Sequence, residues 1–267
     1  MVLEISQRAA KADWEKGSVY LLATNPFEEV RTGVVAREPG TIKWLEDNLQ
    51  WDDSFYDIGA STGGYSLVAA KIMQSLPAGE GMHGTVCAFE PFANNFAALT
   101  TNVMLNVCSE WVFAFPVFLS DLHRIAHIDV HQPLGGVSKH RVVSAPTEQS
   151  HPVLTIGGDT VRSMYQMPRP ELIRINAHDQ VLPILKGMKL TMKDSNIRSV
   201  MIAVDESEDV SNKIEAFMKQ AGFELRTRHP MSGDENGWEF HRVKDVNQPV
   251  SKEPEYVTRD GYALEAR

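Results

Sequence analysis

A glycine-containing turn between an apolar segment and an apolar helix pattern is the part of this sequence best suited to chemistry. Residues 55–58 predict a buried strand, residues 59–64 a tight turn, and residues 65–73 a helix. A second apolar strand, residues 85–90, ends in Glu90, where a carboxylate can accept both hydroxyls of a ribose. Together these segments predict a site for an adenosine-containing cofactor.

The spacing of the glycines narrows the choice of cofactor. Ser61 occupies the middle position of the dinucleotide pattern Gly-x-Gly-x-x-Gly, which disfavours a pyrophosphate. Tyr65 stands where a P-loop has lysine, which disfavours a triphosphate. The remaining pattern, Asp57-x-Gly59-x-x-x-Gly63, admits an uncharged or zwitterionic ligand close to the backbone. S-adenosylmethionine has these properties, and Asp57 either organises the amides of the turn or binds the ligand's ammonium group.

Further motifs extend this pattern over most of the chain, from about residue 38 to residue 223. They are residues 56–66, residues 88–91, Asn102 with Asn106, residues 119–121, Asp159 and residues 185–187. In this order they resemble the FkbM-type class I methyltransferases. The resemblance implies a methyl transfer from S-adenosylmethionine, usually to a hydroxyl oxygen. It also implies a set of cofactor-binding residues: Asp57, Gly59, Ala60, Ser61, Gly63, Tyr65, Ser66, Glu90, Pro91, Ser120, Asp121 and Asn176.

Some of these positions have a purely structural alternative. Ser120 with Asp121 is also typical of a helix start. Asp159 corresponds to an acidic position of the family and is a candidate catalytic residue. However, it follows Gly157 and Gly158, and this pattern is equally typical of a solvated turn.

Residues 172–181 depart from the family pattern, in which Lys-Ile-Asp is followed by further acidic residues. In this chain, the positions that are acidic in the family pattern are occupied by Asn176, His178 and Val181. The position that is glycine in the family pattern is occupied by Asp179. In one interpretation methyl transfer is retained, because attack on a sulfonium needs mainly proximity and orientation. His178 is then the general base, with Asn176 as a second candidate catalytic residue. In the other, the chain is a regulatory or structural protein that binds the cofactor without efficient catalysis.

Composition limits the other function classes. The 267 residues, 43% of them hydrophobic, suffice for one sizeable α/β domain. A net charge of -9 with scattered basic residues argues against nucleic acid as a partner. No signal pattern or bilayer-length apolar stretch occurs, so we expect a soluble, cytoplasmic protein without a membrane partner. The expected substrate is a sugar or another hydroxylated small molecule, and a dinucleotide-dependent oxidoreductase is a weaker alternative.

Cysteines and histidines do not predict a metal site. Cys87 and Cys108 are expected to be buried free thiols. His123, His127 and His131 are four residues apart, but their segment has no helix pattern, so their side chains are not predicted to converge on a metal ion.

The order of the predicted elements favours a doubly wound α/β fold with a mostly parallel, seven-stranded sheet and an antiparallel last strand pair. Residues 1–50 are predicted to form a helical cap with helices at 6–16 and 41–50. Residues 51–245 form the cofactor-binding domain, and residues 246–267 are a polar tail. The predicted strands are residues 55–58, 85–90, 111–119, 172–176, 199–205, 223–228 and 238–243. The segment 121–151 is expected to be a long excursion with at most a short hairpin.

Overall fold

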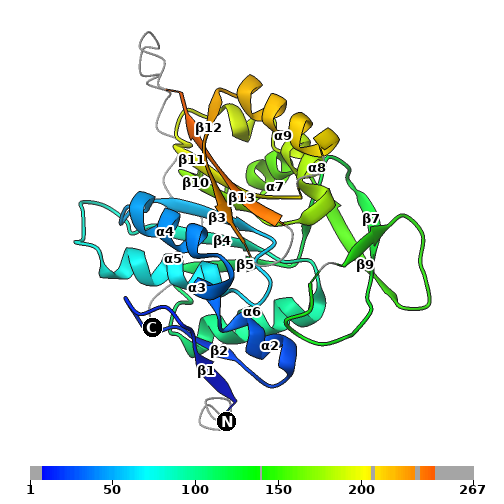
Figure 1. Ribbon diagram of the computed structural model, residues 1–267, viewed down its shortest axis with the longest axis horizontal. Helices are drawn as coiled ribbons and strands as arrows, with labels where there is room; N and C mark the ends of the chain where they lie inside the picture. Colours follow the sequence, from blue (N-terminus) through cyan, green and yellow to red (C-terminus); the bar gives the residue numbers. More distant parts are fainter. Residues whose placement is uncertain (1–7, 139, 206–207, 232–234, 244–267) are drawn as a thin grey trace.

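A seven-stranded sheet with helices on both faces forms the centre of the fold (Figure 1). The structure, a computed structural model, describes residues 8–138, 140–205, 208–231 and 235–243. Every strand of this sheet is parallel to its neighbours except β13, which is antiparallel to both. The prediction of a doubly wound, Rossmann-like sheet with an antiparallel last pair is therefore confirmed. In spatial order the strands are β12 (Phe223–Pro230), β13 (Glu235–Arg242), β11 (Ser199–Asp205), β10 (Leu172–Ile175), β3 (Ser54–Ile58), β4 (Thr85–Phe89) and β5 (Val112–Phe115).

The central strands are buried on both faces, which explains their continuous apolar sequences. In β3, Phe55 belongs to the apolar core on one face and Tyr56 to the core on the other, as the two-residue period of a strand requires. The helices that complete the first core are α4 (Pro39–Asn48), α5 (Gly64–Ser75) and α6 (Ala93–Leu105). Those that complete the second are α7 (Gly158–Met164), α8 (Val181–Gly187) and α9 (Glu208–Gln220).

The N-terminal segment contains a strand pair where a helix was predicted. β1 (Ala9–Lys11) pairs antiparallel with β2 (Tyr20–Leu22), so the helix expected at residues 6–16 is wrong. Side chains of α6 fix the other edge of β2, because Asn106 and Asn102 accept hydrogen bonds from the amides of Tyr20 and Leu22 at 2.8 Å each. These partners lie 86 and 80 residues away in the sequence, and they override the local helix preference. The short helices α2 (Pro26–Arg31) and α3 (Val34–Arg37) follow, and α4 lies where a helix was expected.

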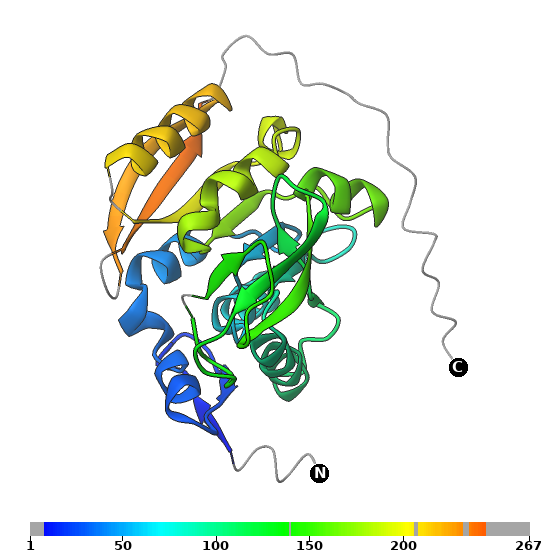
Figure 2. The same ribbon diagram turned by 90° about the vertical axis from the view of Figure 1, so that its right-hand side faces the viewer.

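A second, four-stranded sheet occupies the segment that was expected to be irregular. We call it the insertion sheet; its strands are β6 (Phe118–Leu119), β7 (Arg124–Asp129), β8 (Arg141–Val143) and β9 (Ser150–Ile156). Figure 2 shows it facing the viewer. Pro116 and Val117 separate β5 from β6, so the single strand predicted at 111–119 is divided between the two sheets.

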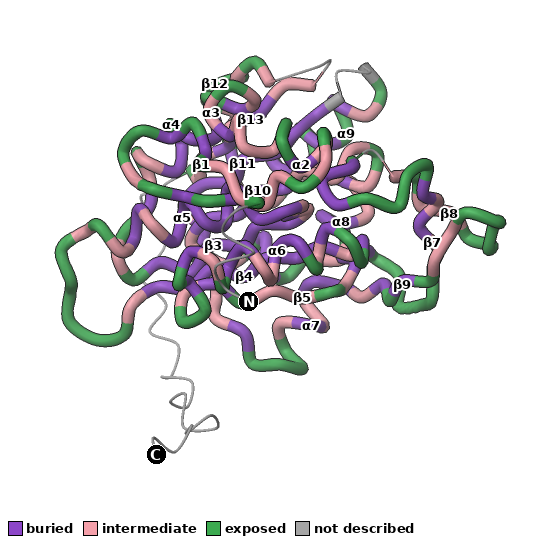
Figure 3. The backbone as a smooth tube through the Cα atoms, turned by 90° about the horizontal axis from the view of Figure 1, so that it is seen from below, coloured by how far each residue is buried: buried purple, intermediate pink, exposed green. Residues whose placement is uncertain are grey.

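Burial differs between the two sheets (Figure 3). The central strands are almost entirely buried, whereas β7 alternates, with Ala126 and Ile128 packed into a small core against Phe92 and Phe118. Cys87 and Cys108 are buried free thiols, as predicted. None of the helices in the described ranges has both the length and the apolar character needed to cross a membrane. The predicted tail at residues 246–267 lies outside the described residues.

Candidate cofactor site

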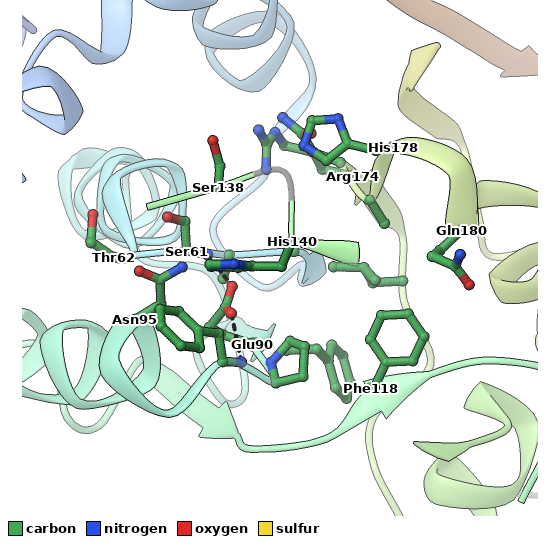
Figure 4. Close-up of a pocket in the computed structure, with 18 of the residues that line it drawn as sticks. Ser61, Thr62, Glu90, Asn95, Phe118, Ser138, His140, Arg174, His178 and Gln180 are labelled. Atoms are coloured by element: carbon green, nitrogen blue, oxygen red, sulfur yellow. Dashed lines mark hydrogen bonds between the residues drawn. The ribbon is translucent and has the colours of Figure 1, made fainter. Parts of the chain in front are cut away.

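A pocket lies where the carboxyl ends of β3, β4 and β10 meet (Figure 4). The register of the sheet creates this meeting point, because Ile58 of β3 pairs with both Phe89 of β4 and Ile175 of β10. α2, α3 and the insertion sheet contribute the other walls. The residues of the sequence-predicted site that line this pocket are Gly59, Ala60, Ser61, Tyr65, Glu90, Pro91, Asn176 and His178.

The turn after β3 brings backbone close to the pocket. Gly59 and Ala60 both donate their amides to the Phe89 carbonyl at 3.0 Å, which folds the chain across the end of β4. Gly59 has a φ of 82°, and a Cβ atom there would lie 2.1 Å from the Asn176 carbonyl oxygen. Only glycine therefore fits at this position, and the turn leaves a surface of backbone that a ligand can approach closely.

Glu90 is buried and holds the turn together. Its carboxylate accepts hydrogen bonds from the Ser61 amide at 2.8 Å and from the Phe92 amide at 2.9 Å. Burial raises the pKa of Glu90 to about 7, although these amides and Arg31 oppose the rise. The Asn95 side chain also interacts with this carboxylate, but a carboxylate has about four acceptor sites, so the group can still accept a hydrogen bond from a ligand.

A buried ionic network lies beside the turn. Arg174 donates to Asp57 at 2.9 Å and to both oxygens of Glu38 at 2.8 and 2.9 Å. Ser66 donates to the other oxygen of Asp57 at 2.6 Å, and Asn176 donates to Glu38 at 3.1 Å. Burial disfavours the charged form of Arg174, but Glu38 and Asp57 outweigh it and raise the pKa of its guanidinium. With two carboxylates and one guanidinium, the network carries one excess negative charge.

Asp57, Ser66 and Gly63 support the site from behind its wall. Asp57 and Ser66 are fully buried and bonded within the network, and neither lines the pocket. Gly63 has a φ of 88°, and a Cβ atom there would lie 2.4 Å from a Leu99 side-chain carbon. Asp57 therefore bonds to the side chains of Arg174 and Ser66 rather than to the amides of the turn, and its binding of a ligand's ammonium group stays a prediction.

Asp159, Ser120 and Asp121 lie away from the pocket. Asp159 accepts hydrogen bonds at 2.7 Å from the amides of Leu190 and Thr191, which cap the short helix η2 (Thr191–Lys193). Ser120 is buried, whereas Asp121 is exposed. Asp159 therefore has a structural role at the start of η2, and it does not line the pocket.

His178 stands at the pocket wall in an unusual conformation. Its φ is 48°, in the left-handed region that histidine seldom adopts. Its Nδ1 atom lies 2.5 Å from Oε1 of Glu235, the first residue of β13. Glu235 could not be predicted as its partner, because β13 reaches the site through its antiparallel pairing with β11.

The N-terminal helices add two cations that sequence reasoning missed. Arg31 of α2 and Arg37 of α3 line the pocket, and neither helix was predicted. Burial, together with Arg37, lowers the pKa of Arg31 to about 10, so it remains a cation at neutral pH. Its Nε atom donates to the Gly136 carbonyl at 2.8 Å and thereby joins α2 to the loop between β7 and β8. No group of three His, Cys, Asp or Glu side chains suited to a metal ion occurs in the part of the chain that the structure describes.

The strand order and the glycine turn define a Rossmann-like class I methyltransferase fold. Hexuronic acid methyltransferase AglP of Haloferax volcanii is 24% identical over 203 residues, which cover 76% of this chain and 74% of that protein. Among solved structures, methyltransferase FkbM of Methylobacillus flagellatus KT matches with a TM-score of 0.52 at 11% identity, over 73% of this chain. The match covers only 44% of that FkbM chain. No protein-family model matches the sequence.

Proposed function

We propose that this protein transfers a methyl group from S-adenosylmethionine to an oxygen of a sugar or another hydroxylated small molecule. The observation that carries the proposal is the meeting of the Gly59 turn and Glu90 in one pocket at the ends of parallel strands. The similarity to a hexuronic acid methyltransferase supports a sugar as the acceptor.

The residues of the pocket fit such a cofactor. Glu90 can still accept a hydrogen bond from a ribose hydroxyl, and the backbone at Gly59 and Ala60 leaves room for a close ligand. Among the pocket-lining residues, the Glu38 carboxylate can attract the sulfonium and ammonium groups of such a ligand, and Arg31 and Arg37 can attract its carboxylate. When bound, the cofactor would supply an electrophilic methyl group.

His178 is suited to accept the proton of the attacking hydroxyl. With Nδ1 donating to Glu235, the imidazole leaves Nε2 free as the acceptor. Glu235 also stabilises the imidazolium that forms when the proton arrives. Asn176 stays a candidate for orienting the acceptor, although its amide also donates to Glu38.

Calorimetric titration with S-adenosylmethionine, S-adenosylhomocysteine and NAD tests the cofactor. Binding of the first two and not of NAD is the expected result, whereas binding of NAD alone would point to an oxidoreductase. Transfer of a labelled methyl group to a panel of neutral sugars, uronic acids and polyketides then tests the activity. Cofactor binding with no transfer to any acceptor would favour a regulatory or structural protein.

A further inference from the structure

Three buried polar atoms on the pocket wall lack a hydrogen-bond partner among the described residues. They are the Ser61 hydroxyl oxygen and both ring nitrogens of His140. Leaving a buried polar group unpaired costs about 1 to 3 kcal/mol, and native proteins avoid it. Their position at one pocket indicates that a bound ligand supplies the missing partners.

The fold fixes the position of His140. Its ring packs on Phe92 with 4.2 Å between the ring centroids, and it points into the pocket (Figure 4). The preceding loop is anchored to α6, because the Asn95 side chain accepts from the Gly136 amide at 2.8 Å and donates to the Val137 carbonyl at 3.0 Å. The unpaired nitrogens are therefore held in place by tertiary contacts.

The order of the strands indicates which part of the cofactor lies near His140. Glu90, the proposed ribose acceptor, ends β4, and His178 lies beyond β3 at the end of β10. A reacting methyl group near His178 places the base of the nucleoside in the opposite direction, toward β5. There the pocket has apolar walls from the segment after β5 and from the insertion sheet, formed by Val117, Phe118, Leu119, Ile128 and Val142.

The protonation state of His140 suits a nucleobase. Burial lowers the pKa of its imidazole to about 4, although the nearby Val137 carbonyl, which does not meet hydrogen-bond geometry with the ring, opposes this; the ring is therefore neutral at pH 7. A neutral imidazole has one donor and one acceptor nitrogen. The edge of adenine offers the complementary pair, an amino group that donates and ring nitrogens that accept.

We propose that the insertion sheet, together with His140 directly before β8, forms the adenine-recognition side of the cofactor site. This inference depends on the proposed function for the presence of an adenosine cofactor. The insertion thereby selects the base of the cofactor, in addition to covering the end of the central sheet.

The test compares S-adenosylhomocysteine with S-inosylhomocysteine, in which a carbonyl replaces the amino group of the base. Calorimetry on the wild-type protein is expected to show tighter binding of the adenosine compound. His140→Phe keeps the packing on Phe92 but removes both nitrogens. It should weaken S-adenosylhomocysteine binding about tenfold and reduce the preference over the inosine compound to near one.

His151→Phe is the matched control, because His151 also packs on Phe92, at 5.6 Å, but does not line the pocket. It should retain both the affinity and the preference. If His140→Phe fails to fold, His140→Gln, which retains a donor and an acceptor, should keep part of the preference.

His140→Ala, which also removes both nitrogens, should lose the preference as His140→Phe does. Equal binding of the two compounds by the wild type, or an unchanged preference in either variant, would overturn this inference alone. A wild-type protein that binds neither compound would overturn the proposed function, and the inference with it.

Discussion

Glu90 combines a structural role with a position at the pocket where it is proposed to bind the cofactor. It accepts two backbone amides of the turn and also faces the pocket. Glu90→Ala should weaken S-adenosylhomocysteine binding by about 2 to 4 kcal/mol through the loss of charge-assisted hydrogen bonds. Because the Ser61 and Phe92 amides also lose their acceptor, the melting temperature should fall. Calorimetry and a thermal melt measure both effects, and an unchanged dissociation constant would remove Glu90 from the cofactor site.

The affinity for S-adenosylhomocysteine should rise between pH 6 and pH 8. The pKa of Glu90 lies at about 7, and ribose hydroxyls donate best to its ionised form. Lowering the pH through 7 protonates the carboxylate, so the affinity should fall by up to about tenfold. Arg31, which faces Glu90, has a pKa of about 10 and stays charged over this range, and His140 stays neutral. Calorimetry at several pH values measures the slope, and the same slope in Glu90→Gln would assign the titration to another group.

His178→Ala should bind S-adenosylhomocysteine normally but turn over about a hundredfold more slowly, because a positioned base is lost. Glu235→Gln is the companion variant, and it should shift the pH profile of turnover, since the His178–Glu235 contact would no longer be charge-assisted. Both are measured with an acceptor found by the methyl-transfer screen. A rate within about threefold of wild type in His178→Ala would leave proximity as the main catalytic device.

The site residues that could be predicted from the sequence are those whose positions depend on neighbouring residues in the chain. The turn at Gly59 and the carboxylate after β4 follow from the spacing of a strand, a turn and a helix, and the structure brings both to the pocket. Asp57 could not be placed in the same way, because its partner Arg174 is 117 residues away. His140 gave no signal either, since only the tertiary fold leaves its nitrogens buried and unpaired.

At the scale of elements, Asn95 of α6 makes two buried hydrogen bonds to the loop between β7 and β8. Asn95→Ala leaves the Gly136 amide without its acceptor and removes the donor to Val137, so it should lower the free energy of unfolding by about 1 to 3 kcal/mol. It should also weaken S-adenosylhomocysteine binding, because the loop before β8 is no longer fixed.

Asn94→Ala is the control, since Asn94 makes one exposed hydrogen bond, to the Pro133 carbonyl. Urea denaturation and calorimetry measure the two effects. Equal losses in both variants would show that the anchor at Asn95 has no special role.

The elements that could be predicted are those whose own residues form a recognisable apolar pattern. Central strands such as β3 and β11 are continuous apolar runs, so their positions were found to within a residue. Strand β1 was not found, because three residues without an apolar pattern are held by pairing with β2. Buried and more exposed residues alternate along a strand of the insertion sheet such as β7. However, Pro116 and the loops between the strands of this sheet interrupt the pattern that would have predicted it.

At the scale of the whole molecule, Arg174 joins the start of α4 to the central sheet. Its side chain is 3% exposed, and that of Asp57 is fully buried. Arg174→Met would leave Asp57 and Glu38 without their counter-ion, which should lower the free energy of unfolding by about 3 to 5 kcal/mol. Lys43→Met, which removes an exposed pair with Asp47, should change it little. Urea denaturation compares the two variants, and an equal effect would contradict a central role for the buried network.

The contact between Gly59 and the Asn176 carbonyl also limits how such a site can change during evolution. The turn at Gly59 is in close backbone contact with the residue that follows β10. Inserting or deleting a residue between Ile175 and His178 would therefore displace the turn. New acceptor preferences are therefore accessible through exchange of side chains at fixed backbone positions.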